Sequence, residues 1–395
     1  MDLSRLFWFT FRFFVFTIPL SQFLSSRLLA LLFVLSLFIR SNKFSDFFKN
    51  SWDFIVYLAV LAIGLLYSAD IYLGIKVIET NLSFIAIPFI FSSLKYIDEK
   101  RSNEIFYSFA LGLILSCCIC LIVATSNFFS TGDLQSFLYY NLTDTLSLHP
   151  TYFAYYLIFA NTYGLYLLYY QTDSSNLLIK SFAILFFLLV LLLTGGQTAF
   201  VSMLLIFAFF ILKFLTEEKS KVKRVTIGLI VTMLLGMFVT TMIAQNGNTV
   251  GLTDSWDRLI LWQSAINAVP EPIFGVGTGD YKEVLNKYYL DHNLIKFANE
   301  SFNSHNQFIQ LLYSNGLLGA LALILMISRP LYLSSKRENI LAILILFPFL
   351  IYGMTEVFLG RYQGVVFFAL THQLFTVQMS PIISSNVLKS NISST

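Results

Sequence analysis

The chain has 395 residues, of which 57% are hydrophobic and only 12% are charged, and its mean hydropathy is +0.73. This composition excludes a soluble domain, because too few polar groups remain to cover a water-facing surface. The formal net charge of +3 is small for such a length, so no nucleic-acid partner is expected. The sequence therefore predicts a polytopic protein whose surroundings are the lipid bilayer.

Apolar runs of about the length of a membrane-spanning helix recur along the whole chain. They predict an all-α polytopic membrane protein with about twelve transmembrane helices. The runs cover residues 5–21, 24–40, 52–68, 72–92, 104–128, 150–170, 177–193, 198–214, 225–243, 305–327, 340–356 and 363–379.

Lys and Arg are concentrated in alternate connections, which the positive-inside rule assigns to the cytoplasm. The connections 67–71, 129–148 and 194–197 hold no Lys or Arg and are expected to face outward. Both termini are then cytoplasmic. The expected division is residues 1–243 for the first nine helices, 244–304 for one large periplasmic loop, 305–379 for the last three helices, and 380–395 for a disordered, Ser- and Asn-rich cytoplasmic tail.

The outer connection 244–304 has roughly 60 residues, and connections of that length are usually functional. One helix is predicted from Thr253 to the prolines at 270 and 272, with tryptophans that suit a helix lying on the membrane surface. A second helix is predicted to start near Asp280. The glycine-rich turn between them, PIFGVGTGD, resembles a phosphate-binding turn, although no parallel strand precedes it as a dinucleotide fold requires.

Two residues at the ends of this loop suggest chemistry. Arg258, on the first predicted helix, can offer a planar, permanently charged fork to phosphate oxygens. The alternative is an interfacial arginine that reaches lipid headgroups. His305 directly precedes an apolar run, where an imidazole can serve as a base near neutral pH. The alternative is that His305 and its asparagine neighbours only cap a membrane helix.

Other polar residues fall on the same outer face under this topology. They are His149, Gln197, Glu356 and Arg361. An active or binding site on that face is the economical explanation. The alternative is that outer loops simply hold the polar residues that the membrane excludes.

Three segments carry a resemblance to a known family. An arginine and a tryptophan at 258 and 262, PIFGVGTGD at 272–280 and SHNQFIQLLYSNGLLG at 304–319 resemble the O-antigen ligase and O-antigen polymerase superfamily of bacterial envelope enzymes. The likeness is best over residues 190–330, and HPTYFA at 149–154 and TEVFLGRYQG at 355–364 are also similar. The resemblance implies a multi-pass protein of the bacterial inner membrane whose active site faces the periplasm.

The resemblance further implies a metal-independent glycosyltransferase without a cofactor. Its donor would be a glycan on polyprenyl (undecaprenyl) diphosphate. In a ligase, the preferred interpretation, the acceptor is a lipid A-core sugar, and in a polymerase it is another lipid-linked glycan repeat. By the resemblance, Arg258 would hold the diphosphate and His305 would activate the acceptor hydroxyl.

The residues fit this chemistry in their own right. A diphosphate leaves readily once cations meet its developing charge, and no Asp-x-Asp pair on the outer loops indicates a metal site. Asn303, Asn306 or Gln307 could orient the imidazole or the sugar. A single displacement would invert the anomeric configuration.

One departure from the family concerns Gln197. Many members carry an arginine where TGGQTA places this glutamine. Either Arg258 and another cation such as Arg361 hold the diphosphate here, or the donor or the activity differs.

A transporter or flippase of about twelve helices is the alternative from another class. The sequence shows no internal repeat, and the notable ionisable residues within the apolar runs are Arg12, Lys76, Glu79 and Glu356. Lys76 and Glu79 are three residues apart and are placed to pair on one helix face. The concentration of polar residues at one membrane face favours an enzyme.

Overall fold

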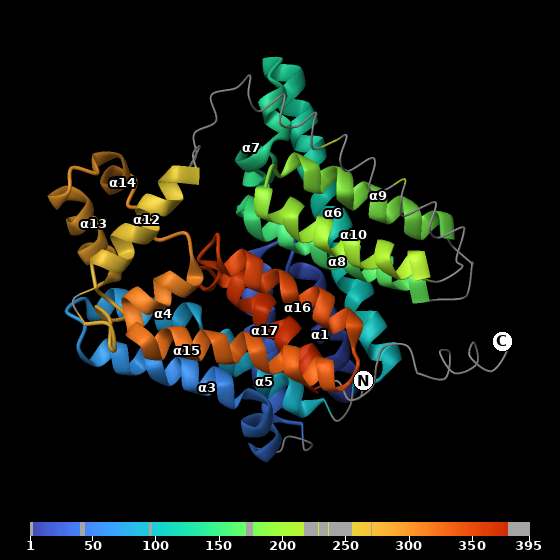
Figure 1. Cartoon of the computed structure of the whole chain (residues 1–395). Helices are drawn as coiled ribbons and strands as arrows, with labels where there is room; N and C mark the ends of the chain where they lie inside the picture. The colour runs from blue at the N-terminus through green and yellow to red at the C-terminus, as the bar shows by residue number, and fades with distance from the viewer. Residues whose placement is uncertain are drawn as a thin grey trace.

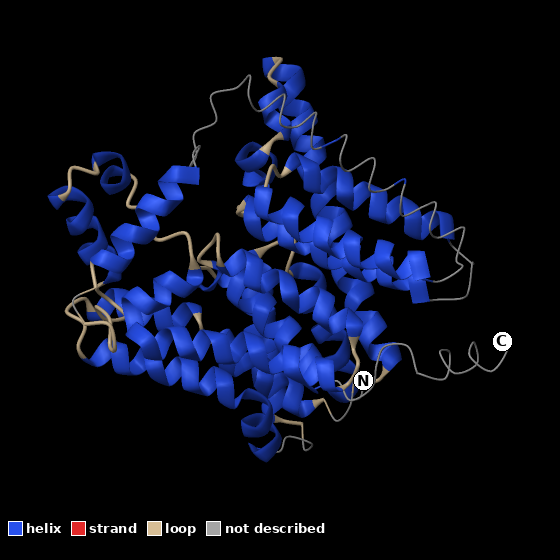
Figure 2. Cartoon of the chain, in the orientation of Figure 1, coloured by secondary structure: helices blue, strands red, loops and turns tan. Residues whose placement is uncertain are grey.

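The computed structural model describes residues 3–39, 44–94, 97–170, 177–216, 255–269 and 271–377, together with positions 228 and 236. Every regular element within these ranges is a helix (Figure 2), which confirms the all-α class. The helices of the main bundle (Figure 1) are α1 (Leu3–Thr17), α2 (Gln22–Leu37), α3 (Phe44–Leu66), α4 (Ile71–Thr80), α5 (Ser83–Ser93), α6 (Glu99–Thr131), α8 (Pro150–Tyr170), α9 (Leu177–Leu193), α10 (Gln197–Thr216), α15 (Gln307–Lys336), α16 (Ile340–Gly353) and α17 (Tyr362–Val377).

Shorter helices fill the connections on one side of the bundle. The connection after α6 contains η1 (Leu134–Phe137), α7 (Tyr139–Thr143) and η2 (Asp144–Leu146), and the connection after α16 contains η3 (Phe358–Gly360). The described part of the large loop contains α12 (Ser255–Asn267), α13 (Tyr281–Asp291) and α14 (Ile295–Asn299), which lie together beside the start of α15 in Figure 1. Both helices predicted in this loop are therefore confirmed.

Eleven of the twelve apolar runs coincide with helices, while the run 225–243 lies outside the described residues. The run 72–92 is divided into α4 and α5 at Asn81 and Leu82. Within the described residues, four segments are long and apolar enough to cross a membrane: Phe44–Leu66, Ile71–Ser93, Glu99–Thr131 and Gln307–Lys336. The protein is thus a multi-pass membrane protein, and the count of twelve crossings and their orientation stay predictions.

Large apolar side chains point outward from these helices. Phe9 is 66% exposed, Phe182 70% and Leu178 84%. In water, such side chains would leave large apolar patches unburied, whereas the hydrocarbon of a bilayer accepts them. The outer surface of the bundle therefore fits a lipid environment.

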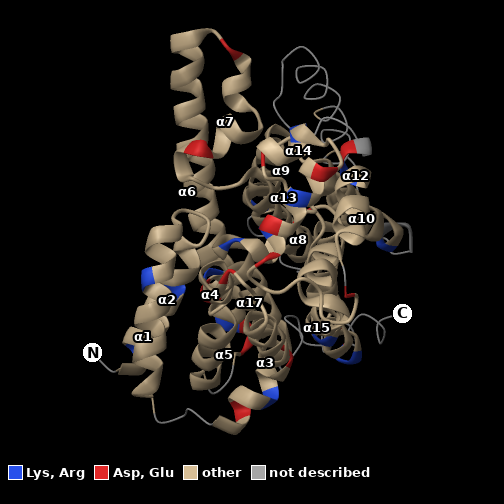
Figure 3. Ribbon diagram, turned by 90° about the vertical axis from the view of Figure 1, so that its left-hand side faces the viewer, with Lys and Arg blue, Asp and Glu red and all other residues tan. Residues whose placement is uncertain are grey.

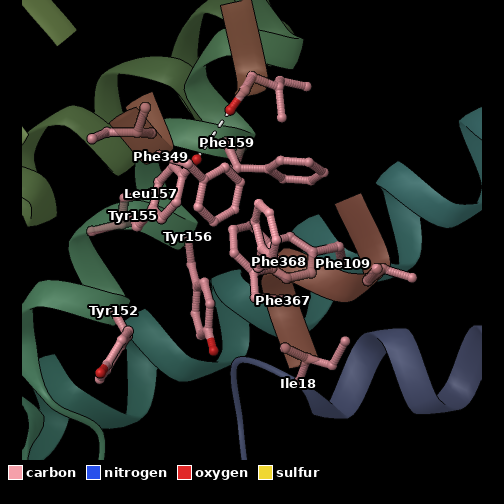
Figure 4. Packing of buried hydrophobic residues seen from close by; sticks show 14 of the residues in the cluster. Ile18, Phe109, Tyr152, Tyr155, Tyr156, Leu157, Phe159, Phe349, Phe367 and Phe368 are labelled. Carbon is pink, nitrogen blue, oxygen red and sulfur yellow. Dashed lines mark hydrogen bonds between the residues drawn. The ribbon is translucent and has the colours of Figure 1, made fainter. Parts of the chain in front are cut away.

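Aromatic rings fill the centre of the bundle. Tyr155 of α8 stacks on Tyr352 of α16 with ring centroids 4.7 Å apart, and Phe367 of α17 lies 5.4 Å from Tyr155. Figure 4 shows these helices meeting through their rings, and the Tyr155 hydroxyl donates to the Ile345 carbonyl at 3.1 Å. Because Tyr155 is buried, this bond satisfies its polar end.

The backbone of α15 is broken near its start. Gly316 has φ +65° and ψ −160° inside this otherwise continuous helix. The next N–H group, of Leu317, donates to the Pro272 carbonyl at 2.9 Å. Glycine is needed here because the position has positive φ and a side chain would overlap the Ile273 carbonyl.

The described part of the large loop has its own small core. Leu261 and Ala265 of α12 pack on Tyr289 and Phe297 and on Tyr313 of α15. On the opposite side of α12, Leu259, Ile260 and Ile266 are exposed. The predicted contact of this helix with the membrane surface stays a prediction, and the Trp256 side chain lies outside the described residues.

Candidate active site

The glycine-rich turn at 272–280 does not present its N–H groups to a ligand. Each of its three glycine N–H groups donates to another part of the protein. The acceptors are the Glu271 carbonyl for Gly275 (2.8 Å), the Ser314 carbonyl for Gly277 (2.8 Å) and the Ser68 hydroxyl for Gly279 (2.9 Å). The phosphate-binding interpretation of this turn therefore does not hold, because its donors are already used.

The turn instead joins the large loop to the bundle. The Asp280 carboxylate accepts the N–H groups of Ala69 and Asp70, at 2.9 and 2.8 Å, where α4 begins. The Thr278 hydroxyl donates to the Leu61 carbonyl of α3 at 2.7 Å and accepts from the Asn315 amide of α15 at 2.8 Å. The loop is thus held against α3, α4 and α15.

These contacts enclose a cavity of about 660 Å³ between α3, α4, α13, the start of α15 and the connection after α16. Such a volume suits a small-molecule or glycan site. Its lining contains five of the eight predicted site residues, which are His149, Asn303, His305, Glu356 and Arg361. Segments far apart in the sequence therefore meet in one place.

His305 lies in a strained backbone conformation at the edge of this cavity. Its φ is +43°, which is unfavourable for a residue with a side chain. Its N–H group donates to the Asn303 side-chain oxygen at 2.8 Å, so Asn303 supports this conformation. Backbone strain of this kind is concentrated at functional sites.

Asn306, and not the His305 imidazole, is the cap of α15. Its side-chain oxygen accepts the N–H groups of Phe308 and Ile309 at 2.9 and 3.0 Å. The capping alternative therefore describes Asn306, which does not line the cavity. The side-chain oxygen of Gln307 accepts the Leu359 N–H group at 2.8 Å, so it joins the His305 segment to the connection that carries Arg361.

The His305 imidazole faces a carboxylate. Its Nδ1 atom lies 3.8 Å from Oε2 of Glu356, and the two side chains are 20% and 14% exposed. Burial alone would raise the pKa of Glu356, but the adjacent His305 and, to a smaller degree, His149 outweigh it and hold that pKa below its usual value. Glu356 is therefore a carboxylate at neutral pH.

His149 is the second histidine of the cavity. Its Nε2 atom lies 2.7 Å from the Tyr140 hydroxyl, and its Nδ1 atom accepts the Thr151 N–H group at 3.3 Å. Burial is the main cause that lowers the pKa of His149 to about 4. The nearby Glu356 carboxylate acts in the opposite direction and raises this pKa, whereas Arg361 and His305 lower it. The imidazole is neutral at pH 7, and an accepting Nδ1 assigns its proton to Nε2.

Arg258 and Gln197 do not line the cavity. Arg258 is half-buried on α12, close enough to Tyr139 to act on the charge of that side chain. Gln197 is exposed at the start of α10, and the hydroxyl of its neighbour Thr198 donates to that of Thr355 at 2.8 Å. Gln197 is thus next to the segment that carries Glu356.

Two cavity residues have no signal in the sequence. Tyr140 lies in a connection without Lys or Arg, and Lys282 lies among ordinary polar residues of α13. Only the packing of distant helices brings them to the cavity.

Residues 182–324 match the family model described as O-antigen ligase. The matched segment includes Gln197, Arg258 and His305 and ends before Glu356 and Arg361. A stretch of 122 residues is 30% identical to a protein of Haemophilus influenzae described as uncharacterized. It covers 28% of this chain and 31% of that relative, so the likeness spans about a third of the relative's length.

Proposed function

We propose that this chain, whose residues 182–324 match the O-antigen ligase model, is a glycosyltransferase of the O-antigen ligase and polymerase superfamily with its active site in the cavity. The donor is a glycan on undecaprenyl diphosphate, and the acceptor is a lipid A-core sugar. The reaction takes place at the periplasmic face of the inner membrane.

The observation that carries this proposal is the His305–Glu356 pair at the cavity. A sugar hydroxyl has a pKa far above neutrality, so its attack on the anomeric carbon needs a base. His305 takes the hydroxyl proton as the new glycosidic C–O bond forms. The Glu356 carboxylate, 3.8 Å away, stabilises the imidazolium that results.

The departing diphosphate takes the electrons of the broken C–O bond and needs cations near it. Arg361 lines the cavity and forms no ion pair with any residue of the described ranges. Arg258 lies near Tyr139, which hydrogen-bonds to the cavity residue Tyr140. We assign the diphosphate to these two arginines, with Gln197 as a weaker neutral donor.

Transfer by the purified, full-length protein in lipid nanodiscs tests the proposal. The donor is an undecaprenyl-diphosphate glycan, and lipid A-core or a second lipid-linked glycan is offered as acceptor. Product on lipid A-core supports a ligase, and extension of the lipid-linked glycan alone would make the protein a polymerase.

His305→Ala is the decisive variant, since loss of a general base typically slows a reaction by about 10²–10⁴-fold. His292→Ala is the matched control, because His292 is an exposed histidine of the same loop that stacks on Tyr288 and does not line the cavity. Normal transfer by His305→Ala would remove His305 from the mechanism.

A further inference from the structure

One part of the cavity lining is not used by the proposed transfer. We call it the lysine arm, and its residues come from α3, α4, α13 and α15 and from the connection between α4 and α5. Its polar residues include Tyr57, Lys76, Asn81, Lys282, Asn286 and Asn315.

Lys76 is an unusual residue for its place in the chain. It lies in Ile71–Ser93, one of the four segments long and apolar enough to cross a membrane. Glu79, three residues later, forms no ion pair with it within the described structure, and the Lys76 Nζ atom instead lies 4.2 Å from the centre of the Tyr72 ring. A charged residue in an apolar segment that lines a cavity indicates a binding function.

Lys282 also lines the cavity, and the glycine-rich turn determines its position. It comes two residues after Asp280, whose carboxylate binds the N–H groups of Ala69 and Asp70. The first turns of α13 and α4 are therefore fixed against each other. Figure 3 shows basic and acidic residues around α13 and α14, yet among the described residues none forms an ion pair with Lys282.

The carboxylates of this cavity do not neutralise the two lysines. Glu356 pairs with His305, and Glu300 lies exposed at the end of α14. The cavity lining therefore includes two exposed lysines that form no ion pair with a carboxylate of the described residues.

Two amides of the lysine arm have unpaired oxygens. Asn81 is 1% exposed, and its Nδ2 atom donates to the Val77 carbonyl at 2.8 Å. The Oδ1 atoms of Asn81 and Asn286 are buried and accept no hydrogen bond within the part of the chain that the structure describes. An unsatisfied buried acceptor is unfavourable, and hydroxyl groups are donors that would satisfy it.

We propose that the lysine arm is a subsite for a saccharide that carries a carboxylate or a phosphate. The hydroxyl groups of the sugar donate to the amide oxygens of Asn81 and Asn286. Its acidic group meets Lys76 and Lys282, and the Tyr57 ring contributes an apolar wall. Only the statement that this saccharide is a substrate of transfer rests on the proposed function.

Binding of small sugars to the full-length protein in nanodiscs tests this subsite without any transfer. Glucose 6-phosphate, glucuronate and glucose are titrated separately and followed by saturation-transfer NMR, which detects weak ligands. At least one acidic sugar should bind about tenfold more tightly than glucose, because hydrogen bonds to charged groups are the stronger ones. The first two probes separate a phosphate from a carboxylate ligand.

Lys76→Gln combined with Lys282→Gln should reduce the affinity of the acidic sugar to that of glucose. Lys287→Gln, an exposed lysine of α13 that does not line the cavity, should leave it unchanged. Equal binding of all three sugars, or an unchanged preference in the double variant, would overturn the subsite.

His305→Ala separates this inference from the proposed function. It should bind the acidic sugar as the unmodified protein does, although it no longer transfers glycan. If the unmodified protein shows no transfer but the preference for acidic sugars depends on the two lysines, the subsite stands and the proposed reaction does not.

Discussion

Among the described residues, two histidines are each paired with a carboxylate, and the two pairs differ in separation and in exposure. His305 and Glu356 face the cavity at a separation of 3.8 Å, and both side chains are partly exposed. His372 of α17 and Asp53 of α3 are 2.6 Å apart, and both side chains are 0% exposed. The first pair is open and loosely joined, whereas the second is closed and tightly bonded.

The closed pair is also fully occupied by protein partners. The second Asp53 oxygen pairs with the Arg329 guanidinium of α15, which also donates to the backbone carbonyl of Asn50 at 3.0 Å. The Gln373 amide lies 3.3 Å from Nδ1 of His372 and donates to the same Asn50 carbonyl. This network joins α3, α15 and α17 toward the end of α15 opposite the cavity, and both carboxylate oxygens of Asp53 are used within it.

The comparison teaches that residue types do not identify a catalytic pair. A base must be able to reach a substrate, so it needs a ring nitrogen that no protein group occupies and a space beside that nitrogen. The open pair has both, while the closed pair can only hold helices together. Substitutions in the two pairs should therefore change different measurements.

The largest expected effect is on stability, at the closed pair. Asp53→Ala leaves the Arg329 charge without its partner in a buried place, which typically costs about 3–5 kcal/mol. The melting temperature in detergent should fall strongly, while Asp46→Ala, an exposed acid in the first turn of the same helix, should have little effect. Equal melting temperatures for the two variants would show that the closed pair is not a structural element.

The second prediction concerns the open pair. Glu356→Gln removes the charge that stabilises the imidazolium and should reduce the transfer rate about 10²-fold, at the low end of what acid–base catalysis contributes. The melting temperature should change little. Glu356→Asp should recover part of the rate, because it restores the charge. A large loss of stability in Glu356→Gln, with a normal transfer rate per folded molecule, would show that the open pair has a structural role like that of the closed pair.

A smaller effect is expected at Arg258 and Gln197, the two proposed diphosphate-binding residues that do not line the cavity. Arg258→Lys keeps the charge but loses the two-pronged geometry, so transfer should fall about tenfold. Transfer by Gln197→Ala should fall less, because a neutral amide forms weaker bonds with phosphate oxygens. Transfer by Gln197→Arg should rise. Rates at several donor concentrations test this order, and a greater loss in Gln197→Ala than in Arg258→Lys would reverse the assignment.

The smallest effect is the pH dependence of stability from His149. Its pKa is about 4 in the folded protein and 6.5 in the unfolded chain, so below pH 6.5 the unfolded state binds the additional proton. This contribution to stability is complete above pH 6.5 and is lost as the pH falls toward 4. Melting temperatures across this range should fall less steeply for His149→Gln. Parallel curves for the two proteins would show that His149 is not buried as described.

The sequence predicted the helices well because their signal is local. Apolar runs, the cap-type residues before them and the prolines and glycines after them gave the position of α13 and most of the bundle. The break between α4 and α5 escaped prediction, because the three polar residues Glu79, Thr80 and Asn81 are too few to divide the apolar run by length.

The candidate site was only partly predictable, because many of its contacts join residues that are far apart in the sequence. The polarity of the outer connections indicated His149, His305, Glu356 and Arg361 together. The use of the glycine-rich turn was misjudged, because its acceptors at Ser68 and Ser314 are distant in sequence. The closed pair escaped notice because Asp53 and His372 are 319 residues apart.

The break at Gly316 makes the start of α15 mechanically part of the large loop. Three backbone hydrogen bonds join the two segments: Val276 to Tyr313, Gly277 to Ser314 and Leu317 to Pro272. The loop is therefore bonded to α15 on both sides of the break, through Tyr313 and Ser314 before it and through Leu317 after it. A glycan that displaced the loop would therefore also shift the start of α15, and with it His305 at the edge of the cavity.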